Sequence, residues 1–445
     1  MGSPAWRIRW INVSSQWIFW SSLRRMKTSG ELQDAIVIGG GPGGSTAATL
    51  LARSGRRILL LEREHFPRFH IGESLLPYNR ILFEEMGVLP ALEAAGFPRK
   101  FGAQFHLGNG LKSLKLRFRD GRFTREPMAF QVERSVFDHI LLRHSRSVGA
   151  DVREGWKFLR AVQGMEDVTV EASDGEGVVH KFQTRFLIDA SGRSNITGNQ
   201  EGLRVNHPRL RKISLFGHFK GVELDDGERA GDMVIVRLAN KWFWLIPVSS
   251  EKVSVGCVMD RDEFAGLNAG PREIFDRFVT ESRTLSRLMK QADLVGDFHT
   301  TSDFSYHNKK LVGSRLLRVG DAAGFLDPIF SSGVYLAMYS ARLAARAVDN
   351  AIHKPSTRER LLGRYEKEVR SALGFYWEMV EGFYTTPFME LFLEPRKRFS
   401  LPAAVNAALA GEPSNRWALR WRMRLFFWLV RLQSRRPIVP QIHFT

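Results

Sequence analysis

The chain has 445 residues, 44% of them hydrophobic, which is enough for a large core divided between two or three lobes. Its single cysteine, Cys257, excludes an internal disulfide and a cysteine metal cluster, and it suits a reducing compartment such as the cytoplasm. The formal net charge of +18 raises the question of a nucleic-acid partner, but the basic residues are scattered and no nucleic-acid-binding motif is present, so we expect none.

The first 33 residues are predicted to form a disordered N-terminal extension. Residues 1–25 are rich in Trp, Ser and Arg and lack a sustained apolar run before a small-residue cleavage site, so we expect no signal peptide. Met26 directly precedes the recognisable fold, which makes residues 1–25 a tail or a mis-assigned start. No stretch of the chain approaches the roughly 18 uninterrupted apolar residues that a membrane-spanning helix needs.

A strand, a helix and a second strand open the fold. Residues 34–39 (DAIVIG) are a short apolar run typical of a buried parallel strand. Residues 43–54 have the composition of a helix, and residues 58–61 form a second apolar run that ends at Glu62. This order predicts a βαβ unit.

The turn between this first strand and its helix carries the sequence GGGPGG, which fits GxGxxG through Gly39, Gly41 and Gly44. Gly39 permits the tight turn, Gly41 lets backbone amides approach a pyrophosphate, and Gly44 lets the helix pack on the strand. The helix N-terminus adds partial positive charge for the phosphates. Glu62 stands at the end of the next strand, where its carboxylate can accept hydrogen bonds from a ribose. The unit therefore predicts a dinucleotide cofactor.

The remaining elements predict an α/β fold with a Rossmann-like, glutathione-reductase-type domain over residues 34–354. Helices are expected at 78–95, 132–148 and 333–351, and strands within 101–131, 152–190, 211–260 and 315–319. A β-sheet substrate lobe, about 101–131 and 205–305, is interleaved with this domain. Residues 355–445 are predicted to form a helical C-terminal region. The twelve histidines form no HExxH or similarly spaced pair, so we expect no metal site.

Two further strand ends specify the cofactor. One carries Asp189-Ala190-Ser191-Gly192, and the other carries Gly320-Asp321 before a helix, where the Asp321 carboxylate can accept from a ribityl hydroxyl. With these motifs, residues 34–350 resemble the glutathione-reductase-like flavoproteins, specifically their aromatic-hydroxylase branch. The resemblance implies FAD, with Asp321 and Arg134 (in QVERSVFDHILL) at the ribityl chain. NAD as the sole cofactor is the alternative.

Three strings point to a particular chemistry. Residues 242–247 (WFWLIP) fit WxWxIP, residues 325–333 (FLDPIFSSG) fit FxxPxxSxG, and residues 66–77 read FPRFHIGESLLP. In this order the strings resemble the flavin-dependent halogenases, particularly the members that modify phenols and pyrroles. The tryptophan pair taken alone would more often fill a core, because alternating aromatic residues on a strand usually do so.

The resemblance implies an enzyme that uses FADH2, O2 and chloride or bromide. Trp242 and Trp244 would form a wall between flavin and substrate, so that the oxidant must travel as hypohalous acid to a lysine, which matches Lys100 in GFPRKFGAQF. Lys100 would either donate a hydrogen bond to hypohalous acid or form a haloamine, and the sequence leaves both open; a solvated, non-catalytic lysine is the alternative. The other implied site residues are Ser331 in catalysis, Pro328 at the flavin, and Ser332 and Gly333 at the halide.

The expected substrate is an electron-rich ring. Members that accept tryptophan carry a glutamate directly before the matched serine, and this chain has Phe330 there. We therefore expect a phenol, resorcinol or pyrrole, either free or bound to a carrier protein, whose acidic surface would suit the positive charge of this chain. A separate flavin reductase is expected to supply FADH2.

The C-terminal region is predicted to roof the active site and to end in a basic helix. Ser414 can cap a helix that runs to about residue 434, with Arg416, Arg420, Arg424, Arg431 and Arg435 recurring at helical spacing and Trp417, Trp421, Leu425, Trp428 and Leu432 on another face. Residues 415–434 could therefore lie on a membrane surface. Packing on the core of the protein, with the arginines in solvent, is the other interpretation.

Three other functions are weighed beside halogenation. An FAD-dependent aromatic monooxygenase shares the nucleotide motifs but needs no lysine beyond a tryptophan wall. A geranylgeranyl or prenyl reductase-type enzyme resembles the nucleotide half but carries Tyr-x-Trp-x-Phe-Pro, whereas this chain has Trp242 and Ile246. In a non-catalytic flavin-binding protein, Lys100 would be incidental.

Overall fold

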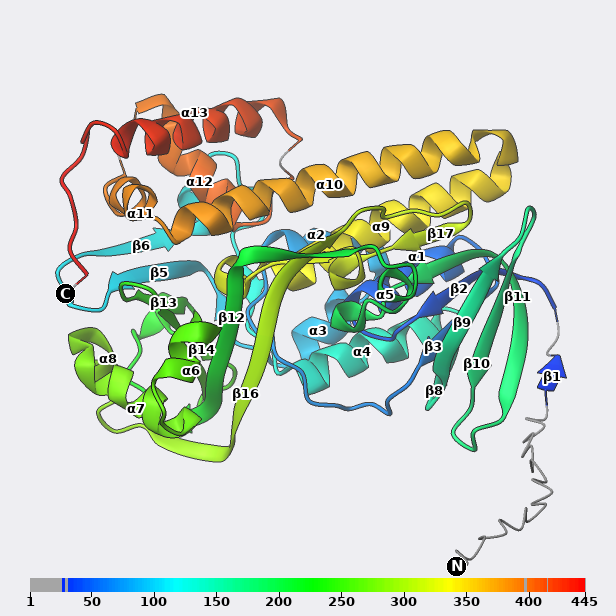
Figure 1. The fold of residues 1–445 in the computed structure, drawn as a ribbon, viewed down its shortest axis with the longest axis horizontal. Coiled ribbons are helices and arrows are strands. Elements are labelled where there is room, and N and C mark those ends of the chain that lie inside the picture. Colours follow the sequence, from blue (N-terminus) through cyan, green and yellow to red (C-terminus); the bar gives the residue numbers. More distant parts are fainter. Residues whose placement is uncertain (1–25, 29–30, 396–397, 414, 445) are drawn as a thin grey trace, which may run out of the picture.

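A computed structural model describes residues 26–28, 31–395, 398–413 and 415–444. It contains two mixed sheets of eight strands each, with helices packed on them and a helical C-terminal region (Figure 1). The predicted α/β class is confirmed. The predicted tail over residues 1–25 and the predicted cap Ser414 lie outside the described residues.

The first sheet is built around the predicted βαβ unit. Its parallel strands are β8 (Asp151–Glu154), β3 (Ile58–Glu62), β2 (Gln33–Ile38), β11 (Val179–Asp189) and β17 (Leu316–Arg318), and β10 (Val168–Ser173) and β9 (Lys157–Gln163) extend it in antiparallel fashion. The helices α1 (Pro42–Arg53), α4 (Arg134–Ser147) and α9 (Ser332–His353) pack together beside the sheet. The β-branched and leucine-rich strands are buried, as parallel strands covered by helices must be.

Part of the predicted disordered extension is ordered. Residues Met26–Thr28 form β1, which pairs in parallel with β11, with Met26 opposite Val179. The extended edge of β11 provides the backbone partners that a local sequence pattern of three residues does not reveal.

The second sheet combines two segments that are far apart in the sequence. Its order is β18 (Gly324–Phe325), β16 (Asp293–Asn308), β12 (Arg204–Lys220), β15 (Val253–Asp260), β14 (Trp242–Pro247), β13 (Met233–Arg237), β5 (Gly102–Leu107) and β6 (Ser113–Arg117). β13 and β5 are parallel, whereas the other neighbours are antiparallel. The short helices α6 (Arg261–Gly266), α7 (Pro271–Glu281) and α8 (Arg283–Leu288) lie at one end of this sheet in Figure 1.

The helix expected at 78–95 is two helices, α2 (Tyr78–Met86) and α3 (Leu89–Ala94). Gly87 ends α2 in the left-handed conformation, with φ of 79°, and Pro90 stands in the first turn of α3. A left-handed glycine is a common helix stop, and proline favours a helix start, so the block expected at 78–95 is confirmed as helical and is divided in two at Gly87.

The C-terminal region contains α10 (Arg358–Phe383), α11 (Thr386–Leu393), α12 (Leu401–Leu409) and α13 (Trp417–Gln433). α13 packs inward through Leu419, Met423, Phe426 and Phe427, so the predicted face of Trp417, Trp421, Leu425, Trp428 and Leu432 is not the face buried against the core. Trp417 and Trp428 are instead 78% and 53% exposed. Tryptophans and arginines alternate around the helix, so spacing alone did not identify the buried face.

Candidate active site

A cavity of about 730 Å³ lies between the two sheets. On one side it is lined by the ends of β2 and β3 and the loop after β11, and on the other by side chains of β12 and β14. Parallel strands present their carboxyl ends to this space, which is where ligands bind in open α/β sheets. We call this space the flavin cavity.

The glycine-rich turn has the geometry that a dinucleotide needs. Gly39, with φ of 96°, and Gly41 both line the flavin cavity. Gly44 does not line it; a Cβ on Gly44 would lie 1.8 Å from the carbonyl oxygen of Gly39, so only glycine lets the helix approach the strand this closely. α1 begins at Pro42 with no side-chain cap, and Pro42 and Gly43 line the cavity, so the uncapped first turn of the helix borders it.

Glu62 lines the flavin cavity at the end of β3. One of its carboxylate oxygens accepts from the amide of Gly40 at 2.6 Å, and the other from the amide of Glu64 at 2.9 Å. These bonds fix the carboxylate at the turn while each oxygen retains a lone pair for a ribose hydroxyl.

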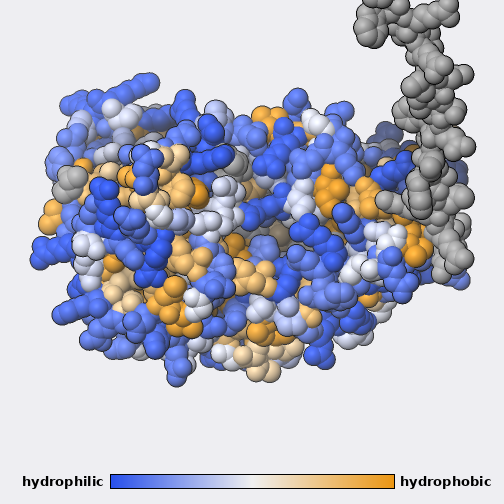
Figure 2. Space-filling model, turned by 60° about the horizontal axis from the view of Figure 1, so that its bottom comes forward, coloured by the Kyte–Doolittle hydropathy of each residue, from blue (hydrophilic) through white to orange (hydrophobic). Residues whose placement is uncertain are grey.

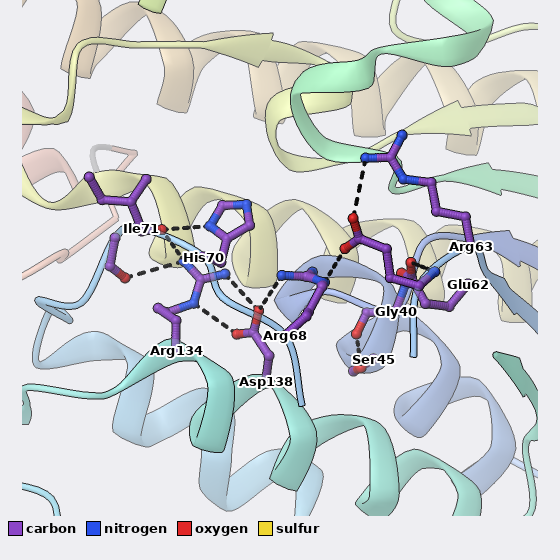
Figure 3. A network of polar contacts seen from close by, with 11 residues as sticks. Gly40, Ser45, Glu62, Arg63, Arg68, His70, Ile71, Arg134 and Asp138 are labelled. Carbon is purple, nitrogen blue, oxygen red and sulfur yellow. Dashed lines mark hydrogen bonds and ion pairs between the residues drawn. The ribbon is translucent and has the colours of Figure 1, made fainter. Parts of the chain in front are cut away.

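An arginine pair forms one wall of the cavity (Figure 3). Arg134 forms two hydrogen bonds with the Asp138 carboxylate and donates to the carbonyl of Ile71 at 2.7 Å. Arg68 forms ion pairs with Glu64 and Asp138, and its Nη2 would lie 3.6 Å from a Cβ on Gly41. The Arg68 guanidinium therefore lies above the glycine-rich turn, where a pyrophosphate would bind.

The late Gly-Asp motif lies beside the glycine-rich turn, because Gly43 and Gly320 both pack against Ala337. Asp321 lines the cavity, and burial raises the pKa of its carboxyl to about 6, against the opposing charges of Arg193 and Arg134. Pro328 also lines the cavity. A carboxyl of this kind can accept from a neutral hydroxyl at modest electrostatic cost.

The predicted halide element begins α9. Ser331, the N-cap, adopts the left-handed conformation and directs its Oγ toward the sulfur of Met233 at 3.2 Å. Ser331 and Gly333 line the cavity, but Ser332 does not, because its side chain is buried. A halide at this helix start could meet backbone amides, as predicted, but the Ser332 side chain points elsewhere.

The residues of the cavity fit FAD. The pyrophosphate could bind the glycine-rich turn, the uncapped start of α1 and Arg68. Glu62 could accept hydrogen bonds from a ribose, and Asp321 could accept one from the ribityl chain. Both sides of the cavity are supplied by elements distant in sequence, which suits a long two-part ligand.

The predicted tryptophan wall lies on β14. Trp242 and Trp244 alternate with Phe243, so both indoles line the flavin cavity while Phe243 packs on the other face of the sheet. Trp242 Nε1 donates to the hydroxyl of Tyr384 at 2.9 Å, and Trp244 Nε1 donates to Ser254 Oγ at 3.1 Å. The ring centroids of the two indoles are 5.9 Å apart. Hydrogen bonds thus hold both indoles in place.

Lys100 is buried outside the flavin cavity, at 1% exposure, which excludes the solvated lysine that we kept as an alternative. Its Nζ donates to Ser74 Oγ at 2.9 Å and to the carbonyl of Leu75 at 3.1 Å, and it lies 5.6 Å from the ring centroid of Phe118. Burial lowers the pKa of Lys100 to about 7, and Asp232 opposes that shift. We call this group of Lys100, Ser74, Leu75, Phe118 and Asp232 the lysine compartment.

The sequence reasoning missed Ser74 and Arg68. Ser74 lines the flavin cavity and also accepts from Lys100, so it joins the two spaces. Both residues lie in the string FPRFHIGESLLP, which resembled the family as a whole without identifying the role of any one residue.

Figure 2 shows a mostly hydrophilic face on which hydrophobic residues form separate patches. Within the described ranges, no helix is long and apolar enough to cross a membrane. The same residues include no group of three or more His, Cys, Asp or Glu side chains placed to hold a metal ion.

Comparison with known proteins agrees with this site. The sequence pattern of the FAD binding domain family matches residues 33–380. A 1H-pyrrole-2-carbonyl-(peptidyl-carrier protein) chlorinase of Pseudomonas fluorescens is 30% identical over 394 residues, which cover 83% of this chain and 87% of the relative. Tryptophan 2-halogenase of Chondromyces crocatus is 35% identical over 78% of this chain and 65% of the relative.

Solved structures lead to the same family. The myxobacterial chondrochloren halogenase is 31% identical and superposes with a TM-score of 0.75, covering 92% of this chain and 91% of that one. The flavin-dependent brominase Bmp2 is 26% identical, with a TM-score of 0.81, over 91% of this chain and the whole of that one. The chain therefore belongs to the flavin-dependent halogenases, which are FAD-dependent enzymes that take a halide as co-substrate.

Proposed function

We propose that this enzyme halogenates a phenolic or pyrrole-type ring with FADH2, O2 and chloride or bromide, and that Lys100 relays hypohalous acid to the ring. The observation that carries the proposal is the position of Lys100. It is a fully buried ammonium outside the flavin cavity, joined to that cavity by Ser74. An isolated buried lysine is costly to a fold, so its presence supports a chemical role.

When bound, FADH2 would supply two electrons that reduce O2 to the peroxide level, which oxidises the halide, and the residues of the chain keep that oxidant from the ring. Trp242 and Trp244 separate the flavin cavity from the space that a ring would occupy. The Lys100 ammonium donates to the oxygen of hypohalous acid and polarises its O–halogen bond. The ring carbon then takes the halogen, and the ring proton leaves with the hydroxide as water. A haloamine on neutral Lys100 stays as the alternative, since a pKa of about 7 populates both forms.

Substrate and partners follow from the same site. Phe330 is buried and stacks edge-on with Phe383, so no carboxylate stands beside the serine to orient an unactivated ring. This supports a ring activated by its own substituents. Two relatives named for pyrrole carried on a peptidyl-carrier protein support a carrier-bound form of the substrate. A separate flavin reductase supplies FADH2 in this proposal.

A product assay tests the proposed reaction. The enzyme is reduced anaerobically with FAD and mixed with oxygenated buffer, bromide and a panel of phenols and pyrroles, both free and carrier-bound. The bromine isotope pattern in a product supports the proposal. A gain of one oxygen would make the enzyme an aromatic monooxygenase instead, and turnover of a prenyl lipid alone would make it a reductase.

Contact with an anionic membrane surface through residues 415–434 stays a prediction. The exposed Trp417 and Trp428, together with the exposed Arg420 and Arg424, support it. Flotation with anionic liposomes, compared for the full chain and a truncation after Glu412, measures it. Equal flotation of both proteins would contradict membrane contact through residues 415–434.

A further inference from the structure

Asp232 is a buried carboxylate at the lysine compartment for which the reaction described above has no use. It directly precedes β13, which pairs in parallel with β5, so that Met233 lies opposite Ala103. This register brings Asp232 beside Gly102, two residues after Lys100. Only 2% of Asp232 is exposed, and its Oδ1 has no hydrogen-bond partner among the described residues.

Two glycines allow this close approach. A Cβ on Gly102 would lie 3.2 Å from both carboxylate oxygens of Asp232. A Cβ on Gly231 would lie 2.0 Å from the carbonyl oxygen of Arg99 and 3.4 Å from the amide of Lys100. Larger side chains at either position would push the loop that carries Asp232 away from the strand that carries Lys100.

A buried carboxylate destabilises a fold unless hydrogen bonds and positive charge compensate it, and the Asp232 carboxylate accepts hydrogen bonds from the Gln104 side chain and the Gly102 backbone. Burial raises the pKa of Asp232 to about 6, and Lys100 is the largest opposing influence, followed by Gln104 and Arg229. The Lys100 ammonium donates to Ser74 Oγ and to the Leu75 carbonyl, and among the described residues Asp232 is the charge that favours its ammonium form. The two groups therefore oppose each other's desolvation.

We propose that Asp232 is the counter-ion of Lys100: it holds the lysine in its ammonium form through space and so sets the pH range in which the lysine acts. It is a positioning residue, and this step rests on the proposed relay by Lys100. Two of the three ammonium N–H groups donate to Ser74 and Leu75, and the third has no partner in the described part of the chain. A through-space counter-ion keeps the charge without occupying that third donor, which stays available to hypohalous acid.

The sign of the effect follows from charge. Replacing Asp232 by asparagine removes the negative charge that favours the ammonium, so Lys100 loses its proton at lower pH. The limb of the pH–rate profile that Lys100 controls therefore moves to lower pH. This direction is the same whether the ammonium or the neutral amine is the active form.

NMR of the protein labelled with ¹³C at lysine Cε tests the proposal without turnover. The Lys100 signal is identified by its loss in Lys100→Met, and the titration runs from about pH 5 to about pH 10. We expect a midpoint near 7 in the native protein and a midpoint about one pH unit lower in Asp232→Asn. Asp232→Glu should restore the native midpoint. The matched control is Asp225→Asn, because that nearby acid pairs with Lys115 and should leave the Lys100 midpoint unchanged.

One result would overturn the inference: a Lys100 midpoint in folded Asp232→Asn that is unchanged from, or higher than, the midpoint in the native protein. If Asp232→Asn does not fold, the native titration decides, because Asp232 labelled at Cγ must titrate near pH 6 and respond to the Lys100→Met change. Failure of the proposed function is distinguishable, since an enzyme that forms no halogenated product can still show the coupled titration. Conversely, Lys100 could be required for halogenation while its titration does not respond to Asp232→Asn. That result would overturn the counter-ion role of Asp232 and leave the proposed relay by Lys100 standing.

Discussion

The flavin cavity and the lysine compartment differ in nearly every physical property. The cavity has a volume of about 730 Å³ and is lined by charged residues, including Arg68, Arg134 and Glu62. The lysine compartment is closed, and its one ammonium is 1% exposed. The difference teaches that the fold provides one large, charged space that suits an anionic cofactor, and that it buries the Lys100 ammonium outside that space.

The largest expected effect comes from a substitution that disturbs the flavin cavity and leaves the lysine compartment intact. In Gly44→Val the new side chain collides with the carbonyl of Gly39, so we expect FAD affinity to fall by about 100-fold or more. Flavin fluorescence titration measures it. Gly363→Ala is the control, since a Cβ there meets nothing within 4 Å. Native affinity in Gly44→Val would contradict the packing role of Gly44.

The second prediction concerns the stability cost of the lysine compartment. Because burial lowers the pKa of Lys100 from 10.5 to about 7, the ammonium is disfavoured in the folded state. Its penalty is absent above about pH 10.5, grows as pH falls, and is complete below about pH 7. We therefore expect Lys100→Met to raise the free energy of unfolding by about 4 kcal/mol at pH 7, and by about 1 kcal/mol or less near pH 10.

Urea unfolding of both proteins at several pH values checks this expectation. The matched control is Lys115→Met, which changes a half-exposed lysine that pairs with Asp225. A Lys100→Met protein that is less stable than the native one by the same amount at every pH would show that Lys100 serves packing alone.

The third prediction concerns displacement of the Trp244 indole. Gly256 lies opposite Trp244 on the neighbouring strand, and a Cβ there would lie 2.1 Å from the indole. Gly256→Ala should displace that indole and lower the yield of halogenated product per FADH2 consumed by about 10-fold, because overpacking of 1–3 kcal/mol shifts the side chain. FAD affinity should stay native. An unchanged yield would mean that the position of Trp244 is unimportant.

The smallest expected effect is at the link between the two spaces. Ser74→Ala removes one acceptor of the Lys100 ammonium and leaves the Leu75 carbonyl. A hydrogen bond contributes about 0.5–1.5 kcal/mol net, and the Leu75 carbonyl still accepts from the ammonium, so we expect the halogenation rate to fall by about 10-fold or less without a change in FAD affinity. Stopped-flow product formation measures the rate, and Ser254→Ala, which affects only the Trp244 indole, serves as the comparison.

Much of the cavity could be predicted from sequence, because its chemistry is local. The glycines of the first turn, Glu62 at the next strand end and Asp321 after a late strand each lie in a short motif whose spacing carries its mechanism. The βαβ unit and the α/β class followed from apolar runs of the right length.

The lysine compartment could be predicted only in part, because its properties are tertiary. Resemblance identified Lys100, but its burial depends on Ser74, Phe118 and Asp232, which come from three distant segments. Sequence spacing did not identify the buried face of α13 for a related reason. Arginines and tryptophans give every face of that helix some apolar surface. Gly87, which divides the helix expected at 78–95, was a local signal that was present but not used.

The central claim is that Lys100 acts after the flavin has done its chemistry, and one paired measurement tests it most directly. FADH2 oxidation and bromide incorporation are followed in the same reaction for the native enzyme and for Lys100→Ala. The account predicts that the variant oxidises FADH2 at the native rate while brominated product falls by about 100-fold or more, the contribution expected of a positioned proton donor. Undiminished bromination by Lys100→Ala would contradict the account.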